Sequence, residues 1–167
     1  TVHVLLSQSQ RKPLFEIFTS STCPPCQPGN LNFHGIVDTI PPDNFVSIKY
    51  QEDFPGSGDP YATAESINRR LTYYGINSIP RMENDGGWDG NANSFTYPLY
   101  KSTRAVPAQY ELWGRFSADT ISKTYSAKIY YKALFETQGT ILQTAIVEKK
   151  TTANVTSKKK TIIQNVV

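Results

Sequence analysis

The chain has 167 residues, of which 38% are hydrophobic, 12% aromatic and only 19% charged, a balance that supports a packed core. Its net charge of +3 comes largely from Lys158-Lys159-Lys160, a run too short to predict nucleic-acid binding. No apolar run approaches the length of a membrane span. The many Ser, Thr, Asn, Gln and Tyr residues are typical of a protein outside the cytoplasm.

The first segments lead to a loop. Residues 1–12 are predicted to form an N-terminal arm, and Pro13–Phe18 is a short apolar run. This run ends in four hydroxyl residues, Thr19–Thr22. The pattern predicts a buried strand that delivers the chain to a loop.

The loop is followed by Cys23-Pro24-Pro25-Cys26, which contains both cysteines of the chain. Such a pair can close as a small disulfide ring or open to two thiols. At a helix N-terminus, the helix dipole favours the thiolate of the first cysteine, which is the nucleophile in thiol–disulfide exchange. The prolines remove backbone donors and stiffen the ring. The tetrapeptide therefore indicates a redox pair at the start of a helix.

Two other interpretations of this pair are a zinc site and an inert disulfide. A zinc site needs two further ligands, and only His3 and His34 could supply them, at spacings unlike any zinc finger. We therefore predict no metal. An inert structural disulfide remains an alternative. It would close a very short loop, however, and a disulfide stabilises a fold least when the loop it closes is short.

Two helices and a strand are predicted next. Residues 27–40 have a rough helical spacing that ends at Pro41-Pro42, and residues 45–50 alternate like a strand. Residues 52–60 form a loop by composition, and residues 61–74 indicate a helix that Gly75 caps. The predicted inward positions are Leu31, Phe33, Ile36, Val37 and Ile40, and then Ala62, Ala64, Ile67, Leu71 and Tyr74.

The segment 76–105 begins with Ile79-Pro80, which opens a predicted strand. Asp85-Gly86-Gly87 is a turn signal, residues 88–93 are predicted to be a polar loop, and residues 94–105 a short helix.

From about Pro107 the pattern changes to short alternating strands. Residues 110–116 and 125–133 alternate, and 141–147 and 161–167 are two further apolar segments. This favours an antiparallel sheet or half a sandwich. We predict two regions, 13–105 and 106–167, and we expect the second to continue past the end of this chain.

The order strand, Cys-x-x-Cys, helix, strand, helix, Ile-Pro, strand resembles the thioredoxin fold over residues 13–105. The predicted fold class is thus an α/β thioredoxin-like fold followed by an antiparallel, sandwich-like β-segment. The resemblance implies that Pro80 has a cis peptide bond and lies beside the redox pair. It also implies that Ile79 offers backbone groups to a substrate chain.

The whole chain resembles a narrower group, the secreted or envelope-anchored thioredoxin-like proteins of Bacteroidota with a β-sandwich segment. Residues 16–26, Pro80-Arg81-Met82-Glu83 with Asp85–Trp88, and Ala145–Lys149 carry this resemblance. It implies a secreted, periplasmic or cell-surface protein, with a possible larger envelope or extracellular assembly as partner. Some members are cargo of the type IX secretion system.

The resemblance also assigns roles. Cys23 would be the nucleophile and Cys26 the resolving thiol, acting on the thiols and disulfides of a partner protein without a cofactor. Pro24 and Pro25 would tune the potential and border the substrate. Redox thioredoxins carry a buried acid where this chain has Ile17, so Glu16, one residue earlier, either serves as the proton-transfer partner of Cys26 or points elsewhere.

Two functions follow from these observations. The first is an extracytoplasmic thiol–disulfide oxidoreductase. The second is a structural or adhesive surface protein in which the Cys23–Cys26 disulfide is static. The absence of an aromatic residue before Cys23, where Thr22 stands, favours the second.

Overall fold

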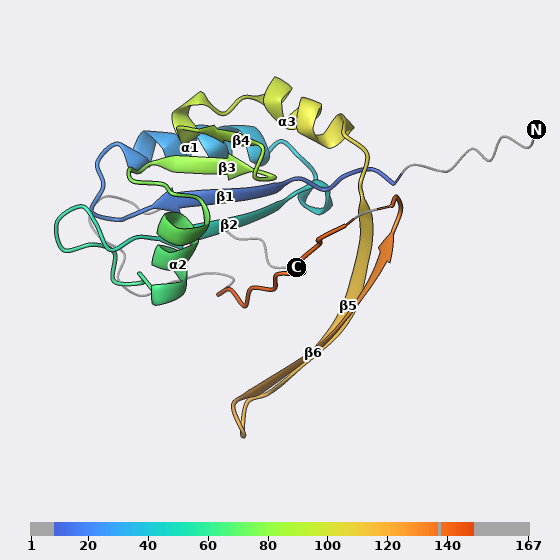
Figure 1. The fold of residues 1–167 in the computed structure, drawn as a ribbon. Helices are drawn as coiled ribbons and strands as arrows, with labels where there is room; N and C mark the ends of the chain where they lie inside the picture. The colour runs from blue at the N-terminus through green and yellow to red at the C-terminus, as the bar shows by residue number, and fades with distance from the viewer. Residues whose placement is uncertain (1–8, 137, 149–167) are drawn as a thin grey trace, which may run out of the picture. The chain divides into compact units, whose positions relative to one another are not determined.

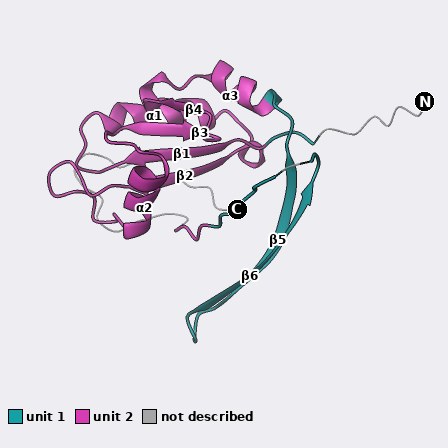
Figure 2. Cartoon of the chain, in the orientation of Figure 1, with its two compact units in different colours: residues 1–11, 105–144 teal, residues 12–104, 145–167 magenta. Residues whose placement is uncertain are grey.

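The structure, a computed structural model, describes residues 9–136 and 138–148 of the chain. Figure 2 distinguishes two units, residues 12–104 with 145–167 and residues 1–11 with 105–144. The first unit contains a mixed α/β arrangement and the second a two-stranded antiparallel sheet. The prediction of an α/β region followed by antiparallel strands is confirmed at this level.

A four-stranded sheet forms the centre of the α/β unit (Figure 1). Its strands, in spatial order, are β2 (Val46–Gln51), β1 (Leu14–Thr19), β3 (Arg81–Asn84) and β4 (Trp88–Gly90). Strand β1 is parallel to β2 and antiparallel to β3, and β3 is antiparallel to β4. Because successive side chains of a strand point to opposite faces, the odd and even residues of β1 face different layers.

Helical segments follow or connect these strands. They are α1 (Cys26–Val37), η1 (Pro42–Asn44), α2 (Ala64–Asn68), the π-helical η2 (Arg69–Tyr73), η3 (Ala92–Ser94) and α3 (Tyr97–Ala105). Thr63 and Ser66 begin α2 with a capping box, in which each hydroxyl accepts from the other residue's backbone N–H at 3.1 Å. Gly75 has a φ of 68°, as a glycine that ends a helix requires.

The hydrophobic core lies on the odd-numbered face of β1. The Phe15 ring lies 5.6 Å from Phe33 of α1 and 5.1 Å from Phe95, and Tyr100 of α3 completes the group. Each such side chain stabilises the fold by about 1.5–3 kcal/mol through burial. This core holds α1, which carries Cys26, firmly against the sheet.

The buried face of α1 differs in part from the prediction. Phe33, Val37 and, beyond the helix, Ile40 are buried as expected, but Leu31 is exposed. The inward positions include Cys26, Gly29, Phe33 and Val37, spaced three or four residues apart, which leaves Leu31 on the opposite side.

In α2 and η2 the predicted apolar face is wrong in part. Ala62, Ile67 and Tyr74 are partly buried, but Ala64 and Leu71 are exposed. The buried residues are Ser66 and Arg70, four positions apart. Spacing by apolar residues alone could not reveal this, because Arg70 is buried against an acidic partner, Glu52.

Residues 88–93 were predicted to be a polar loop, but Trp88–Gly90 is strand β4. The turn Asp85-Gly86-Gly87 brings it back beside β3, so that Asn84 pairs with Trp88. The ring centroids of Trp88 and Phe95 are 6.5 Å apart, so this strand packs the partly buried Trp88 against the core.

The second unit contains one long hairpin, β5 (Tyr110–Asp119) and β6 (Thr124–Ala133). Its turn is capped by Asp119, whose Oδ1 accepts from the backbone N–H groups of Ile121 and Ser122 at 2.8 and 3.2 Å. The two predicted strands are confirmed. Residues 141–147, predicted as a third strand, contain no strand, and residues 161–167 lie outside the described residues.

Candidate functional site

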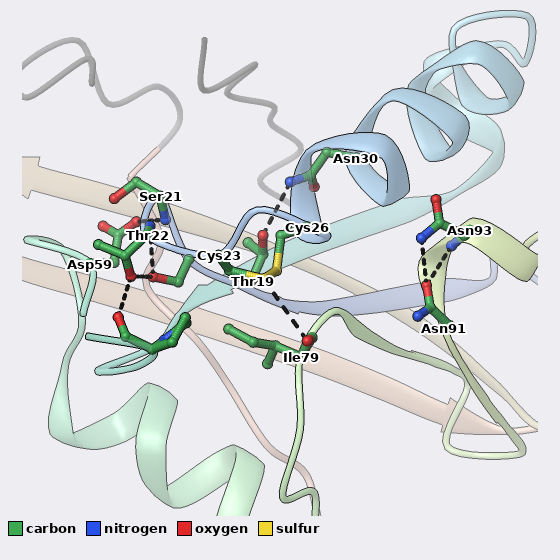
Figure 3. The surroundings of a disulfide bond; sticks show 12 residues. Thr19, Ser21, Thr22, Cys23, Cys26, Asn30, Asp59, Ile79, Asn91 and Asn93 are labelled. Atoms are coloured by element: carbon green, nitrogen blue, oxygen red, sulfur yellow. Dashed lines mark hydrogen bonds between the residues drawn. A yellow bond between two sulfur atoms is a disulfide. The ribbon is translucent and has the colours of Figure 1, made fainter. Parts of the chain in front are cut away.

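Cys23 and Cys26 form a disulfide with an S–S distance of 2.09 Å (Figure 3). The backbone between them closes a turn, in which the N–H of Cys26 donates to the carbonyl of Cys23 at 3.1 Å. Ser20 anchors the start of this turn, because its carbonyl accepts from the N–H of Cys23 at 3.2 Å. The predicted Cys-x-x-Cys pair is therefore joined within a rigid local loop.

The pair lies at the N-terminus of α1, which begins at Cys26 with Pro25 at the N-cap. Cys23 precedes the helix by three residues and Cys26 is in its first turn. Free backbone N–H groups of a first turn favour negative charge nearby. Pro24 and Pro25 are exposed between the two cysteines, where they border any approaching molecule.

Both cysteines are nearly enclosed in this oxidised form. Cys23 is 4% exposed and Cys26 1% exposed. Cys23 is thus the more accessible of the two, but by a small margin. Reactive cysteines are usually partly exposed, so this burial bears directly on the choice between a working and a static disulfide.

Ile79 and Pro80 lie beside Cys23. The Cys23 Sγ is 3.9 Å from the carbonyl oxygen of Ile79, and the Ile79–Pro80 bond is cis, as the resemblance implied. Pro80 is buried and Ile79 partly exposed. Gly29 allows α1 to approach this segment, since a Cβ added there would lie 3.6 Å from the Cβ of Pro80 and 3.2 Å from that of Ala92.

A polar pair lies on the inner side of Cys26. The Asn30 amide donates to the Thr19 hydroxyl at 3.1 Å, and Figure 3 shows this bond beside the disulfide. Asn30 is four residues after Cys26, hence on the same side of α1. Ile17 is buried in the core on this face of the sheet. Thr19 and Asn30 therefore supply polar atoms on this side of the site, whereas Ile17 is apolar.

Glu16 lies on the other face of the sheet. Its Oε1 accepts from Arg69 Nε and from the Tyr50 hydroxyl, both at 2.8 Å, and its Oε2 accepts from the Tyr74 hydroxyl. Burial, and then the Glu16 carboxylate, raise the pKa of Tyr50 and Tyr74 above the ordinary value, so both remain hydrogen-bond donors. The structure thus joins Glu16 to Arg69 and two tyrosines rather than to Cys26.

The reason is strand geometry. Phe15 and Ile17 take the face that α1 covers, and Glu16, between them in sequence, must point away from it. An acid one residue before Ile17 therefore cannot take the place of Ile17 beside α1, because neighbouring residues of a strand point to opposite faces.

The loop after β2 forms a second border of the site. The Thr22 hydroxyl donates to the carbonyl of Pro55 at 2.6 Å, and Asp59 Oδ2 accepts from the N–H of Ser21 at 2.7 Å (Figure 3). Gly58 has a φ of 74°, and an added Cβ would lie 2.5 Å from the Asp53 carbonyl carbon. Only glycine fits there, so residues 53–59 fold closely back on themselves.

A buried ion pair anchors this loop. Arg70 Nε donates to Glu52 Oε2 at 2.6 Å, and Arg70 Nη1 donates to the Ile76 carbonyl at 2.9 Å. The Arg70 guanidinium also lies 4.6 Å from the centre of the Phe54 ring. Burial raises the pKa of Glu52, and Arg70 opposes that shift. Arg70 thereby connects the loop after β2 with the segment that leads to Ile79-Pro80.

The sequence pattern does not indicate the contacts made by Thr19, Asn30, Asp59, Glu52 and Arg70. The loop 52–60 was recognised only by its composition, and a buried charge gives no periodic signal. The available hint was the pair Asp59-Pro60, which favours a turn, but it does not say what the carboxylate binds.

Among the described residues, no group of three His, Cys, Asp or Glu side chains could hold a metal ion. None of the helices in the described ranges is both long and apolar enough to cross a membrane.

No family model and no curated protein matches the chain. A crystal structure of a protein from Agrobacterium tumefaciens, solved as a structural genomics target, is similar with 19% sequence identity and a TM-score of 0.50. The match covers 66% of this chain and 54% of that chain, so this chain corresponds to about half of its length. At this identity the likeness concerns the fold alone.

Proposed function

We propose that this chain is a thiol–disulfide oxidoreductase with a thioredoxin-like arrangement of its α/β unit. The single observation that carries the proposal is the Cys23–Cys26 disulfide at the N-terminus of α1, with Cys23 Sγ 3.9 Å from the carbonyl of Ile79. The order β1, cysteine pair, α1, β2, α2, Ile79-Pro80, β3 supports it.

In the reducing direction, the Cys23 thiolate attacks one sulfur of a partner's disulfide. A bond forms between Cys23 and that sulfur, the partner's S–S bond breaks, and the second partner sulfur leaves as a thiolate that takes a proton from water. The Cys26 thiolate then attacks Cys23 Sγ and releases the first partner sulfur. The partner gains two electrons, and the Cys23–Cys26 disulfide forms again.

In the oxidising direction the same steps run backwards, and the partner's two thiols become a disulfide. The proton that the Cys26 thiol loses passes to water.

The partner is a protein chain with a thiol pair or a disulfide. Ile79 offers its backbone beside Cys23, and Pro24 and Pro25 border the approach. We further propose a secreted, periplasmic or cell-surface location and kinship with the Bacteroidota group. The low charged fraction of 19% supports the location.

A static disulfide in a structural or adhesive surface protein is the second candidate. The burial of Cys23, which is 4% exposed, favours it, because buried cysteines are generally inert. In that case the pair only rigidifies the turn before α1.

Trapping of the mixed disulfide tests the proposal. The Cys26→Ser variant, reduced and then mixed with a synthetic peptide that contains one disulfide, should form a covalent adduct that dithiothreitol removes. Cys26→Ser lacks the second thiol, so resolution stops at the adduct. The matched Cys23→Ser variant should form at least ~10-fold less adduct. Equal adduct from both variants, or none from either, would support the static disulfide.

A further inference from the structure

The β5–β6 hairpin has one face without charge. The register pairs Tyr110 with Ala133 and continues to Asp119 with Thr124, so residues of equal parity in β5 share a face with their partners in β6. We call the following ten residues the apolar hairpin face: Tyr110, Leu112, Gly114, Phe116 and Ala118 of β5, with Tyr125, Ala127, Ile129, Tyr131 and Ala133 of β6.

The reverse face is polar. Glu111 Oε2 lies 3.9 Å from Lys132 Nζ, and Arg115 pairs in register with Lys128. The exception is Trp113, which stacks on Tyr130 with ring centroids 5.9 Å apart. The hairpin is therefore amphipathic, and water can solvate only its reverse face favourably.

The apolar hairpin face is open in the described structure. Apart from the first register pair, Tyr110 and Ala133, the face has five large side chains that are between 41% and 81% exposed. They are Leu112, Phe116, Tyr125, Ile129 and Tyr131. With about 150–250 Å² for an aromatic side chain, they expose roughly 600 Å², the upper limit for a patch on a monomer. A lone two-stranded hairpin is also only marginally stable in water.

The order of side chains on this face is complementary to itself. Gly114 and Ile129 are register partners at the middle of the face. Residues at equal distances on opposite sides of this middle pair form four sets within the two strands. These sets are Tyr110 and Ala118, Leu112 and Phe116, Tyr131 and Ala127, and Tyr125 and Ala133. Three of these four sets match a large side chain with a small one.

We propose that a second copy of this chain covers the apolar hairpin face. A twofold axis in the plane between the two sheets, perpendicular to the strands and beside Gly114 and Ile129, would set Tyr110, Tyr125 and Tyr131 each against an alanine of the other copy, and Leu112 against Phe116. Packed sheets lie about 10 Å apart, and interleaving of large and small side chains fills that space. The same patch serves both copies, as an isologous interface requires.

The buried area is sufficient for this assembly. Two copies would bury about 1,200 Å², the lower bound of stable protein interfaces. The face carries no charge that would attract a charged partner. Its order of large and small side chains instead fits the same face of a second copy whose strands run in the opposite direction. This inference does not depend on the chemistry of Cys23 and Cys26.

Sedimentation of the whole chain gives the first test. The chain of 18.7 kDa should sediment as a reversible dimer of twice that mass. Phe116→Lys places a charge in the interface and should raise the dimer dissociation constant at least ~100-fold. The adjacent Ser117→Lys, on the reverse face, should change it less than ~3-fold. A monomeric wild type, whatever else covers the face, would overturn the proposal.

A charge-pairing experiment tests the geometry and controls for folding. Because Leu112 of one copy faces Phe116 of the other, Phe116→Lys mixed with Leu112→Asp should recover a heterodimer, although each variant alone is monomeric. Recovery also shows that both variants are folded. A mixture that stays monomeric while both variants keep the wild-type circular dichroism would contradict the proposed axis.

Discussion

The carboxylate of Glu16 is buried beneath the sheet, and the guanidinium of Arg69 compensates its charge at 2.8 Å. The Arg69 guanidinium also makes a cation–π contact, because its central carbon lies 3.8 Å from the centre of the Tyr73 ring. A buried ion pair contributes little net stability over an apolar pair, but removal of one partner leaves the other charge unpaired. Glu16 therefore has a structural role that accounts for its position without any chemistry at Cys26.

Arg69→Met should lower the free energy of unfolding by about 3 kcal/mol, because Glu16 would remain buried without a counter-charge. Urea unfolding at pH 7 measures this loss. Arg81→Met is the matched control, since Arg81 and its partner Asp89 are both substantially exposed. Removal of an exposed pair costs less than about 1 kcal/mol. Similar losses in the two variants would contradict the account of Glu16.

At the scale of the elements, three carboxylates lie side by side across the sheet. Glu16 of β1 is opposite Glu83 of β3, which is opposite Asp89 of β4, so all three share one face. Arg69 pairs with the first and Arg81 with the third. Burial, and then Asp89, raise the pKa of Glu83 to about 7. Glu83 is therefore largely protonated below neutral pH, where it can donate to Asp89.

This row makes stability depend on pH. A carboxyl with a raised pKa in the folded state contributes stability that is fully present below its unfolded pKa of 4.5 and lost as the pH rises through about 7. Glu83→Gln keeps the hydrogen-bond donor without the charge. It should therefore reduce the decline in unfolding free energy between pH 5 and 8 by about 1–3 kcal/mol, measured by urea unfolding. An unchanged decline would refute the role of Glu83.

The sequence predicted most elements correctly because each has a local signal. The apolar residues Phe15 and Ile17 indicate the central strand, and Pro41-Pro42 indicates the end of the helical segment that contains α1. Asp85-Gly86-Gly87 indicates the turn after β3. It could not predict the buried ion pairs Glu52–Arg70 and Glu16–Arg69, because these depend on which side each helix presents to the sheet. For the same reason, Leu71 was placed inward.

At the scale of the whole molecule, each unit presents a different kind of surface. The α/β unit presents a disulfide bordered by Pro24, Pro25 and Ile79. The hairpin presents an apolar face that we assign to a second copy of the chain. The alternation of residues 110–116 and 125–133 predicted the strands, but not that the described part of the sheet contains two strands alone. Strand number depends on pairing between distant segments, for which a single sequence has no direct signal.

The central claim is that Cys23 and Cys26 are a working redox pair. Its most direct test is equilibration of the chain with glutathione or dithiothreitol buffers, followed by iodoacetamide alkylation at pH 7. We predict a reversible disulfide with a potential between about −270 and −120 mV, and faster alkylation at Cys23 than at Cys26. A potential below about −300 mV, with Cys23 unreactive after reduction, would contradict the claim and leave a static disulfide.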